Sequence, residues 1–166
     1  MWFWAVLAII ILLIIFDGLF VVRQQTAAIV ERFGKFKRVA NAGLNFKIPL
    51  IDRIAGRVSL RIQQLDVRIE TKTKDNVFVV CVVSVQYHVI PNKAVDAFYK
   101  LQHPQEQITA FVFDTVRARV PAIILDDVFE KKDDIAQAVK SELDAVMDDF
   151  GYQIIKALVT DIDPDA

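Results

Sequence analysis

The chain begins with an unbroken apolar run from Trp2 to Phe16, and residues 19–22 extend it past Asp17 and Gly18. As a helix, residues 2–22 would reach roughly 31 Å, because each helical residue adds about 1.5 Å. The hydrocarbon core of a bilayer is about 30 Å thick. The extended run therefore predicts an N-terminal transmembrane helix that acts as a membrane anchor over residues 1–22.

Two other interpretations of this run compete with a retained anchor. A cleaved signal peptide needs a basic start and a small-residue cleavage site, but no Lys or Arg precedes Trp2 and bulky residues lead directly into Arg23. A break at Asp17-Gly18 would instead give a segment that enters the membrane without crossing it. A core helix is disfavoured, because so small a domain could hardly wrap it. The predicted anchor residues are Trp2, Trp4, Ile10, Leu13, Phe16 and Phe20.

Charge is unevenly distributed along the chain, although the net charge is only −1. Residues 23–61 carry nine basic and two acidic side chains, a net of +7, whereas residues 121–166 carry four and twelve, a net of −8. By the positive-inside rule, basic residues that follow the anchor place the domain in the cytoplasm. We expect membrane-surface contact from Arg23, Arg32, Lys35, Lys37 and Arg38. Nucleic acid is excluded as a partner, because the acidic half would repel it.

The first half of the remaining chain has the alternation of β-strands. The segment 26–36 predicts a strand that Gly34 ends. The apolar positions switch parity near Gln63-Gln64, which predicts a β-bulge or a bend. The run 76–89 alternates with one fully apolar face, and the polar turn 71–76 before it predicts an antiparallel hairpin. The second half is helical, with an amphipathic stripe at Ile135, Val139, Leu143, Val146 and Phe150, a cap at Gly151, and a returning strand over 152–162.

Catalytic chemistry is scarce in this sequence. Cys81 is the one cysteine, so neither an intrachain disulfide nor a thiolate metal cluster can form. His88 and His103 are the only histidines, and Cys81 and His88 lie on opposite faces of their predicted strand. The sequence contains neither a phosphate-binding glycine loop nor a Gly-x-Ser-x-Gly motif. We therefore predict no enzyme activity, no metal and no cofactor. A hydrolase that uses Ser84 or Ser141 is a rival interpretation, although neither serine has the setting of an activated nucleophile.

Several segments together resemble the SPFH or Band 7 superfamily, which includes stomatins, prohibitins and flotillins. They are VERFGKF (30–36), AGLNFKIPLIDRI (42–54), TKDNVFV (73–79), DAFYKL (96–101), ITAFVFDTVRARVP (108–121), LDDVFEKKDDIAQAV (125–139) and GYQIIKALVTDIDPD (151–165). The likeness is strongest to bacterial stomatin-like and plant hypersensitive-induced-reaction proteins.

The resemblance implies an α+β fold, in which an antiparallel sheet packs with helices over residues 23–166. It also implies a homo-oligomeric scaffold at the cell membrane that organises microdomains and associated membrane proteins. An alternative role is regulator or adaptor of a membrane-bound protease or channel. The partners expected from the resemblance are the lipid bilayer, further copies of the chain, and a membrane protease or channel.

The last residues carry a helix start signal, with Asp163 suited to an N-cap, Pro164 to the first helical position and Asp165 to the first turn. We expect a helix to begin there. The family resemblance implies that a coiled-coil oligomerisation region follows, so we expect these 166 residues to be part of a longer protein.

Overall fold

The computed structural model describes residues 2–164 and divides the chain into two compact units, residues 1–61 and 62–166. Both units contain antiparallel strands, and the second packs its strands with helices, so the α+β class is confirmed. The predicted anchor, residues 1–22, shares its unit with strands β1 to β5. The predicted domain, residues 23–166, contributes to both units.

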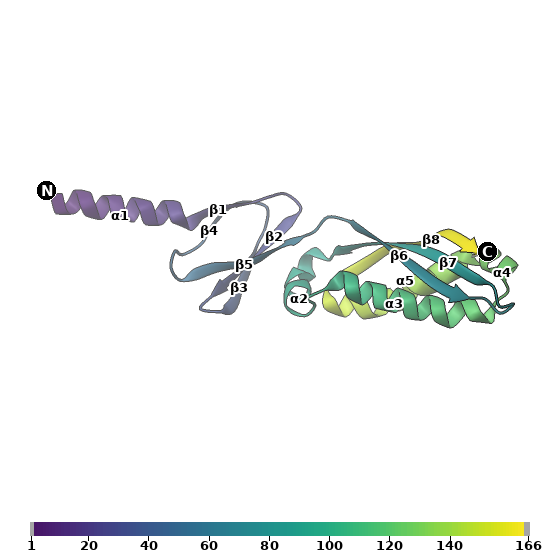
Figure 1. Ribbon diagram of the computed structural model, residues 1–166. Coiled ribbons are helices and arrows are strands. Elements are labelled where there is room, and N and C mark those ends of the chain that lie inside the picture. The colour runs from purple at the N-terminus through teal and green to yellow at the C-terminus, as the bar shows by residue number, and fades with distance from the viewer. Residues whose placement is uncertain (1, 165–166) are drawn as a thin grey trace. The chain divides into compact units, whose positions relative to one another are not determined.

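The unit of residues 1–61 contains one helix and two small sheets (Figure 1). Its elements are α1 (Trp2–Gly18), β1 (Leu19–Val22), β2 (Thr26–Arg32), β3 (Lys35–Ala40), β4 (Gly43–Phe46) and β5 (Asp52–Ser59). β1 pairs with β4, and the second sheet has the order β3-β2-β5, with all pairs antiparallel. A small core of Val22, Ala28, Val30 and Ala40 holds the strands, and Phe20 and Ile54 pack against it.

The apolar N-terminal run does not continue as one helix. α1 ends at Gly18 and residues 19–22 form β1, so the prediction of a helix through Val22 is wrong. The helix breaks at Asp17-Gly18, where the alternative interpretation placed a break. Tertiary contact explains the break, because the Lys47 backbone N–H donates to the Gly18 carbonyl over 2.7 Å. Among the helices of residues 2–164, none is both long and apolar enough to cross a membrane.

The apolar positions switch parity near Gln63-Gln64 because the boundary between the two units lies there. β5 ends at Ser59 and belongs to the first sheet system, whereas β6 begins at Gln63 in another sheet. The prediction at this position is a β-bulge or a bend. The bulge is wrong, because β6 pairs with β7 from Gln63 onward without a register shift, whereas the chain does bend nearby, at Arg61. Residues 60–62 connect two strands that belong to different sheets. Each strand therefore has its own alternation of inward and outward side chains.

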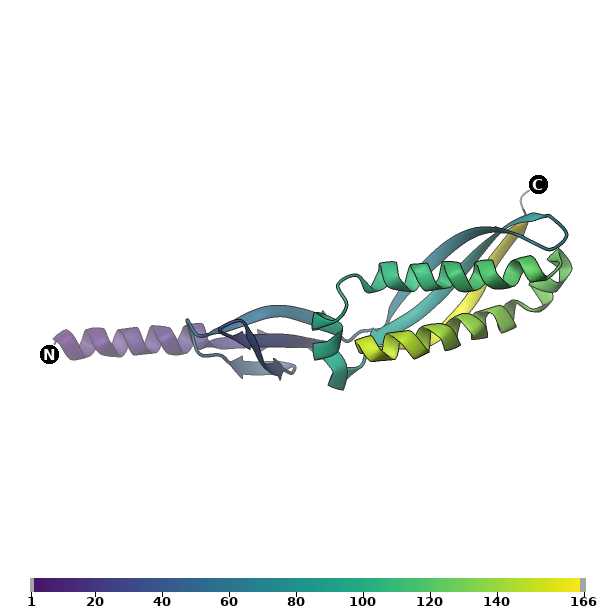
Figure 2. The ribbon, with the colours of Figure 1, turned by 90° about the horizontal axis from the view of Figure 1, so that it is seen from below.

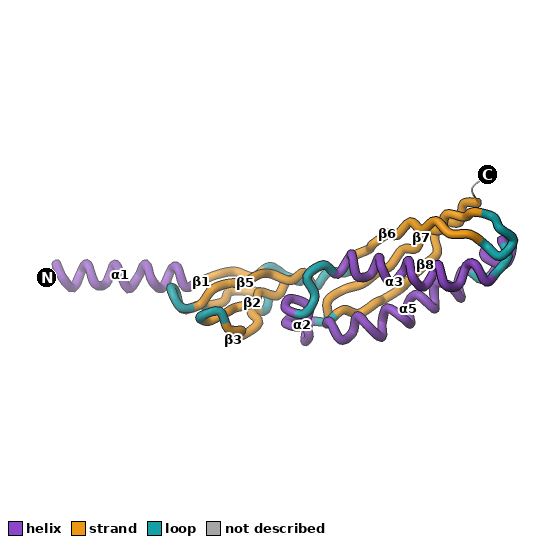
Figure 3. Tube along the Cα trace, turned by 60° about the horizontal axis from the view of Figure 1, so that its bottom comes forward, coloured by secondary structure: helices purple, strands orange, loops and turns teal. Residues whose placement is uncertain are grey.

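The unit of residues 62–166 is one three-stranded antiparallel sheet with helices on one face, as Figures 2 and 3 show from two sides. The strands are β6 (Gln63–Lys72), β7 (Phe78–Val89) and β8 (Tyr152–Pro164), in the order β6-β7-β8. The helices are α2 (Ala94–Tyr99), α3 (Pro104–Arg119), α4 (Leu125–Glu130) and α5 (Lys132–Met147). α3 packs on β6, and α5 packs on β8 and on α3.

Sequence periodicity predicts most of this second core. β6 and β7 form the expected antiparallel hairpin. The apolar face of β7 is buried along Val79, Cys81, Val83, Val85, Tyr87 and Val89, and α5 buries Ile135, Val139 and Leu143. Gly151 takes the left-handed conformation, at φ 83°, and ends the last helical turn as predicted. Asp163 and Pro164 lie within β8, and the rest of the predicted helix start falls outside the described residues.

The TKDN turn ties the β6–β7 hairpin to α4. The Thr73 hydroxyl donates to the Asp75 carboxylate over 2.5 Å and accepts the Val77 N–H over 3.2 Å. Asp75 also accepts the N–H of Leu125, the first residue of α4, over 3.2 Å. These bonds to the charged form lower the pKa of Asp75. The polar turn therefore holds the β6–β7 hairpin to the start of α4 by hydrogen bonds.

Candidate membrane-contact site

The predicted anchor residues separate into two groups. Trp2, Trp4, Ile10, Leu13 and Phe16 all lie on α1 and expose between 47% and 89% of their surface. Helices that are apolar on all sides are normally buried in a protein core or in a membrane. Phe20 differs, because it lies in β1 and packs against the small core.

The end of α1 is held by the loop between β4 and β5. Besides the hydrogen bond to Gly18, Lys47 places its ammonium 3.6 Å from the Asp17 carboxylate. Gly18 is required for this approach, because a Cβ there would lie 2.4 Å from a ring carbon of Phe46 and 2.8 Å from the Lys47 carbonyl oxygen. The helix and the loop are therefore fixed to each other at this point.

The other end of the loop is held by a bidentate ion pair. Arg32, at the end of β2, donates to both carboxylate oxygens of Asp52 over 2.7 and 3.2 Å. The Ile48 N–H donates to the same carboxylate over 3.0 Å. The bonds from Arg32, followed by that from Ile48, lower the pKa of Asp52 to about 2. This pair brings the loop beside the tip of the β2–β3 hairpin, residues 33–34.

Four exposed apolar side chains gather at these two tips, and we call them the apolar rim: Phe33, Ile48, Leu50 and Ile51. Phe33 is 80% exposed and Leu50 is fully exposed. Both residues have positive φ, 50° and 70°, a conformation that bulky side chains rarely adopt. Backbone strain of this kind concentrates at functional sites. The rim thus holds large apolar side chains in solvent at the end of the unit where α1 joins it.

The five basic residues predicted to contact the membrane surface differ in position and in whether their side chains are already hydrogen-bonded. Lys35 and Lys37 are exposed on β3, close to the rim. Arg32 is occupied by Asp52, and Arg38 donates to the Phe46 carbonyl and to Asn45. Arg23 is exposed but precedes β2, so it lies at the end of that strand opposite the rim.

The sequence reasoning missed the rim and one basic residue beside it. Arg53 is exposed and directly follows Asp52, so it joins Lys35 and Lys37 near the rim. The available signal was one apolar residue in the turn segment FG at 33–34 and three in KIPLI at 47–51, where turns are ordinarily polar.

The side chains considered for catalysis are either buried or hydrogen-bonded to other groups of the protein. Burial raises the pKa of the Cys81 thiol to about 11, so its reactive thiolate is disfavoured. Ser84 donates to Asp66 over 2.5 Å, and Ser141 donates to the Gln137 carbonyl over 2.9 Å. Within residues 2–164, no group of three or more His, Cys, Asp or Glu side chains is placed to hold a metal.

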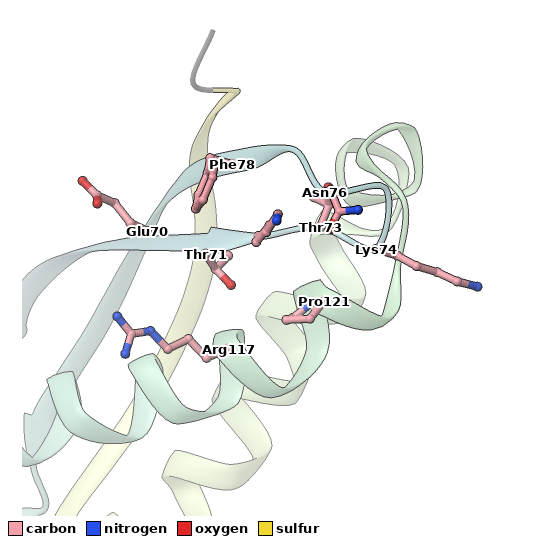
Figure 4. Close-up of a pocket in the computed structure, with 9 residues that line it drawn as sticks. Glu70, Thr71, Thr73, Lys74, Asn76, Phe78, Arg117 and Pro121 are labelled. Atoms are coloured by element: carbon pink, nitrogen blue, oxygen red, sulfur yellow. The ribbon is translucent and has the colours of Figure 1, made fainter.

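A surface hollow lies between β6 and α3 and is open to solvent (Figure 4). Thr71 and Arg117 face each other across it, and Lys74 points away from it. Its lining contains neither histidine nor cysteine, so it lacks the usual general base and thiol nucleophile.

Comparison with known proteins agrees with this architecture. The model of the SPFH domain / Band 7 family matches residues 20–166. The chain is 51% identical over 145 residues to hypersensitive-induced response protein 4 of Arabidopsis thaliana, a match that covers 87% of the chain and 50% of that protein. It is 31% identical to human mitochondrial stomatin-like protein 2, with 85% of the chain and 39% of that protein covered.

A third relative is an uncharacterized protein of Methanocaldococcus jannaschii, which is 31% identical over 164 residues, 98% of the chain and 81% of that protein. The chain spans about half the length of the Arabidopsis relative and less of the human one. The family match covers the whole second unit and residues 20–61 of the first unit, and α1 lies outside it. The chain belongs to the SPFH domain / Band 7 family.

Proposed function

We propose that the protein is a membrane-attached, non-enzymatic scaffold that forms homo-oligomers and organises membrane microdomains and their associated proteins. The observation that carries this proposal is the exposed apolar rim at the end of the unit where α1 joins it. Monomeric soluble proteins seldom keep large apolar side chains together in solvent. Lipid is the environment in which α1 and the rim would both be stable.

The proposed attachment has three parts. α1 is about 25 Å long at about 1.5 Å per residue, and it embeds in the hydrocarbon. The rim enters the interfacial region beside it. Lys35, Lys37 and Arg53 then face anionic headgroups, each contributing about 1 kcal/mol of attraction. Basic residues that follow α1 favour a domain in the cytoplasm, and protease added to sealed cells should spare it.

Lipid-depth measurement tests the rim independently of α1. Leu50→Cys, labelled with an environment-sensitive dye, is reconstituted as the full chain into vesicles that carry spin-labelled lipids. Cys81 is only 2% exposed and is not expected to take the label. We expect strong quenching by the lipid labels and weak quenching by aqueous iodide.

The matched control carries the same dye at Lys132→Cys, an exposed position of α5, where iodide should quench strongly and the lipid labels weakly. Iodide quenching at position 50 equal to that at position 132 would show that the rim stays in water. The proposed attachment would then be wrong.

A further inference from the structure

The sheet of the second unit has an edge that no strand of the described chain covers. β6 pairs with β7 alone, along all ten of its residues. Every second residue of such an edge strand leaves its backbone N–H and C=O groups unpaired by the sheet. A partner strand can therefore add to β6 by backbone hydrogen bonding.

The side chains on the open face of β6 alternate in charge. Asp66, Arg68, Glu70 and Lys72 are all exposed, and Figure 4 shows Glu70 directed away from α3. Asp66 accepts the Ser84 hydroxyl, and the Lys72 ammonium lies 5.3 Å from the Phe78 ring centre. Within residues 2–164, Arg68 and Glu70 make no ion pair with another side chain.

When a second copy of this strand runs in the opposite direction, each charge can lie opposite a charge of the other sign. If a second β6 runs antiparallel and is centred on Ile69, Asp66 lies opposite Lys72 of the second copy. Arg68 then lies opposite Glu70 of the second copy, and the two-fold axis repeats both pairs. Residues 68 and 70 have the same parity along the strand, so this register also aligns the free backbone groups of the two edges.

We propose that β6 is a two-fold contact surface for a second copy of this chain, joined edge to edge in this register. The proposal rests on the proposed homo-oligomer and names one of its contacts. Charges on an edge strand can also serve to prevent pairing. A row of one sign would repel a second copy, whereas this alternating row attracts one, and opposite charges across a strand pair stabilise it.

Charge exchange tests the register in the full chain, with the dimer dissociation constant measured by sedimentation over a concentration series in detergent. Glu70→Arg turns two attractions into two repulsions, and we expect about tenfold weaker dimerisation. The double variant Arg68→Glu with Glu70→Arg restores opposite charges and should return to within about twofold of the original. The matched control is Glu130→Arg, exposed at the end of α4, which should change nothing.

Disulfide formation tests the same register directly. Arg68→Cys in one preparation should cross-link to Glu70→Cys in another, because directly opposite Cβ atoms lie about 5 Å apart. Gln64→Cys mixed with Glu70→Cys is the control and should not cross-link, since residue 64 lies four positions from the partner of residue 70.

The outcomes separate this inference from the proposed function. A double variant that stays as weak as Glu70→Arg, or equal cross-linking from the control pair, overturns the β6 contact. Dye quenching at position 50 is unaffected by these variants, so membrane attachment can hold while the β6 contact fails.

Discussion

The two units treat apolar side chains in opposite ways. The unit of residues 62–166 encloses Val83, Val85 and Val139 completely between its sheet and its helices. The unit of residues 1–61 has a small core of short side chains and leaves Phe33 and Leu50 in solvent. The first pattern is that of a domain stabilised by its own core. The second leaves apolar side chains exposed that the proposed membrane contact would cover.

Charge separates the same two regions. Residues 23–61 carry a net charge of +7, and residues 121–166 a net charge of −8. Anionic headgroups attract the first region and repel the second. Burial and charge therefore both agree with the proposal that the first unit contacts lipid.

The largest effect should come from charges placed on α1. Ile10→Arg together with Leu13→Arg adds two cations to the apolar surface, each costing about 2.5–3.5 kcal/mol in hydrocarbon. We expect the full chain to lose its retention on vesicles in a flotation assay. Gln105→Arg with Gln137→Arg, both at exposed positions of the second unit, should float normally. Equal flotation of the two double variants would contradict the role of α1.

Replacing one leucine with alanine in each unit compares how much each side chain contributes to the free energy of unfolding. Leu143 is 1% exposed in the second core, and Leu143→Ala should lower the free energy of unfolding by about 2–5 kcal/mol. Leu50 is fully exposed, and Leu50→Ala should change it by less than about 0.5 kcal/mol. Denaturant unfolding in detergent measures both. If Leu50→Ala destabilised the protein as much as Leu143→Ala, the rim would belong to the folded core.

Basic residues near the rim should matter more than those far from it. Lys35→Gln with Lys37→Gln should weaken binding to anionic vesicles by about 1 kcal/mol per residue at low salt, and less at high salt. Arg23→Gln removes a charge at the opposite end of the strand and should have little effect. Partition into vesicles of increasing anionic content measures the difference. Equal losses at positions 23 and 35 would mean that only net charge counts.

The smallest effect concerns acid stability of the first unit. Asp52 has a folded pKa of about 2, below its ordinary value of 3.8, because Arg32 and Ile48 bond its charged form. Its contribution to stability is therefore complete above about pH 4 and is lost as the pH falls through about 2. Asp52→Asn should remove this part of the pH dependence, as followed by the fluorescence of a dye at position 50. An unchanged acid profile would show that the ion pair does not hold the loop.

The regular elements were predictable because their signals are local. The β6–β7 hairpin follows from alternation on both sides of a polar turn, and α5 follows from Ile135, Val139 and Leu143 at helical spacing. The family was also recognisable from short segments spread over most of the chain.

The candidate site was not predictable in the same way, because distant contacts create it. α1 ends where it does because Lys47, far along the chain, bonds Gly18. The rim exists because Arg32 and Asp52 bring two turns together. A sequence pattern shows that Phe33 and Leu50 are apolar, but it does not show that the two turns that carry them are brought together.

The bond between Lys47 and Gly18 has a mechanical consequence. Bilayers differ in thickness, and an embedded helix tilts or shifts in response. If α1 embeds in lipid as proposed, the β4–β5 loop would follow that movement, because the Lys47 N–H donates to the last carbonyl of α1. Asp52 follows the loop and accepts hydrogen bonds from Arg32. A displacement of the loop would therefore reach the paired strands β2 and β5. Under the proposed attachment, a change in membrane thickness would thus be transmitted through this junction as a mechanical load on the first sheet.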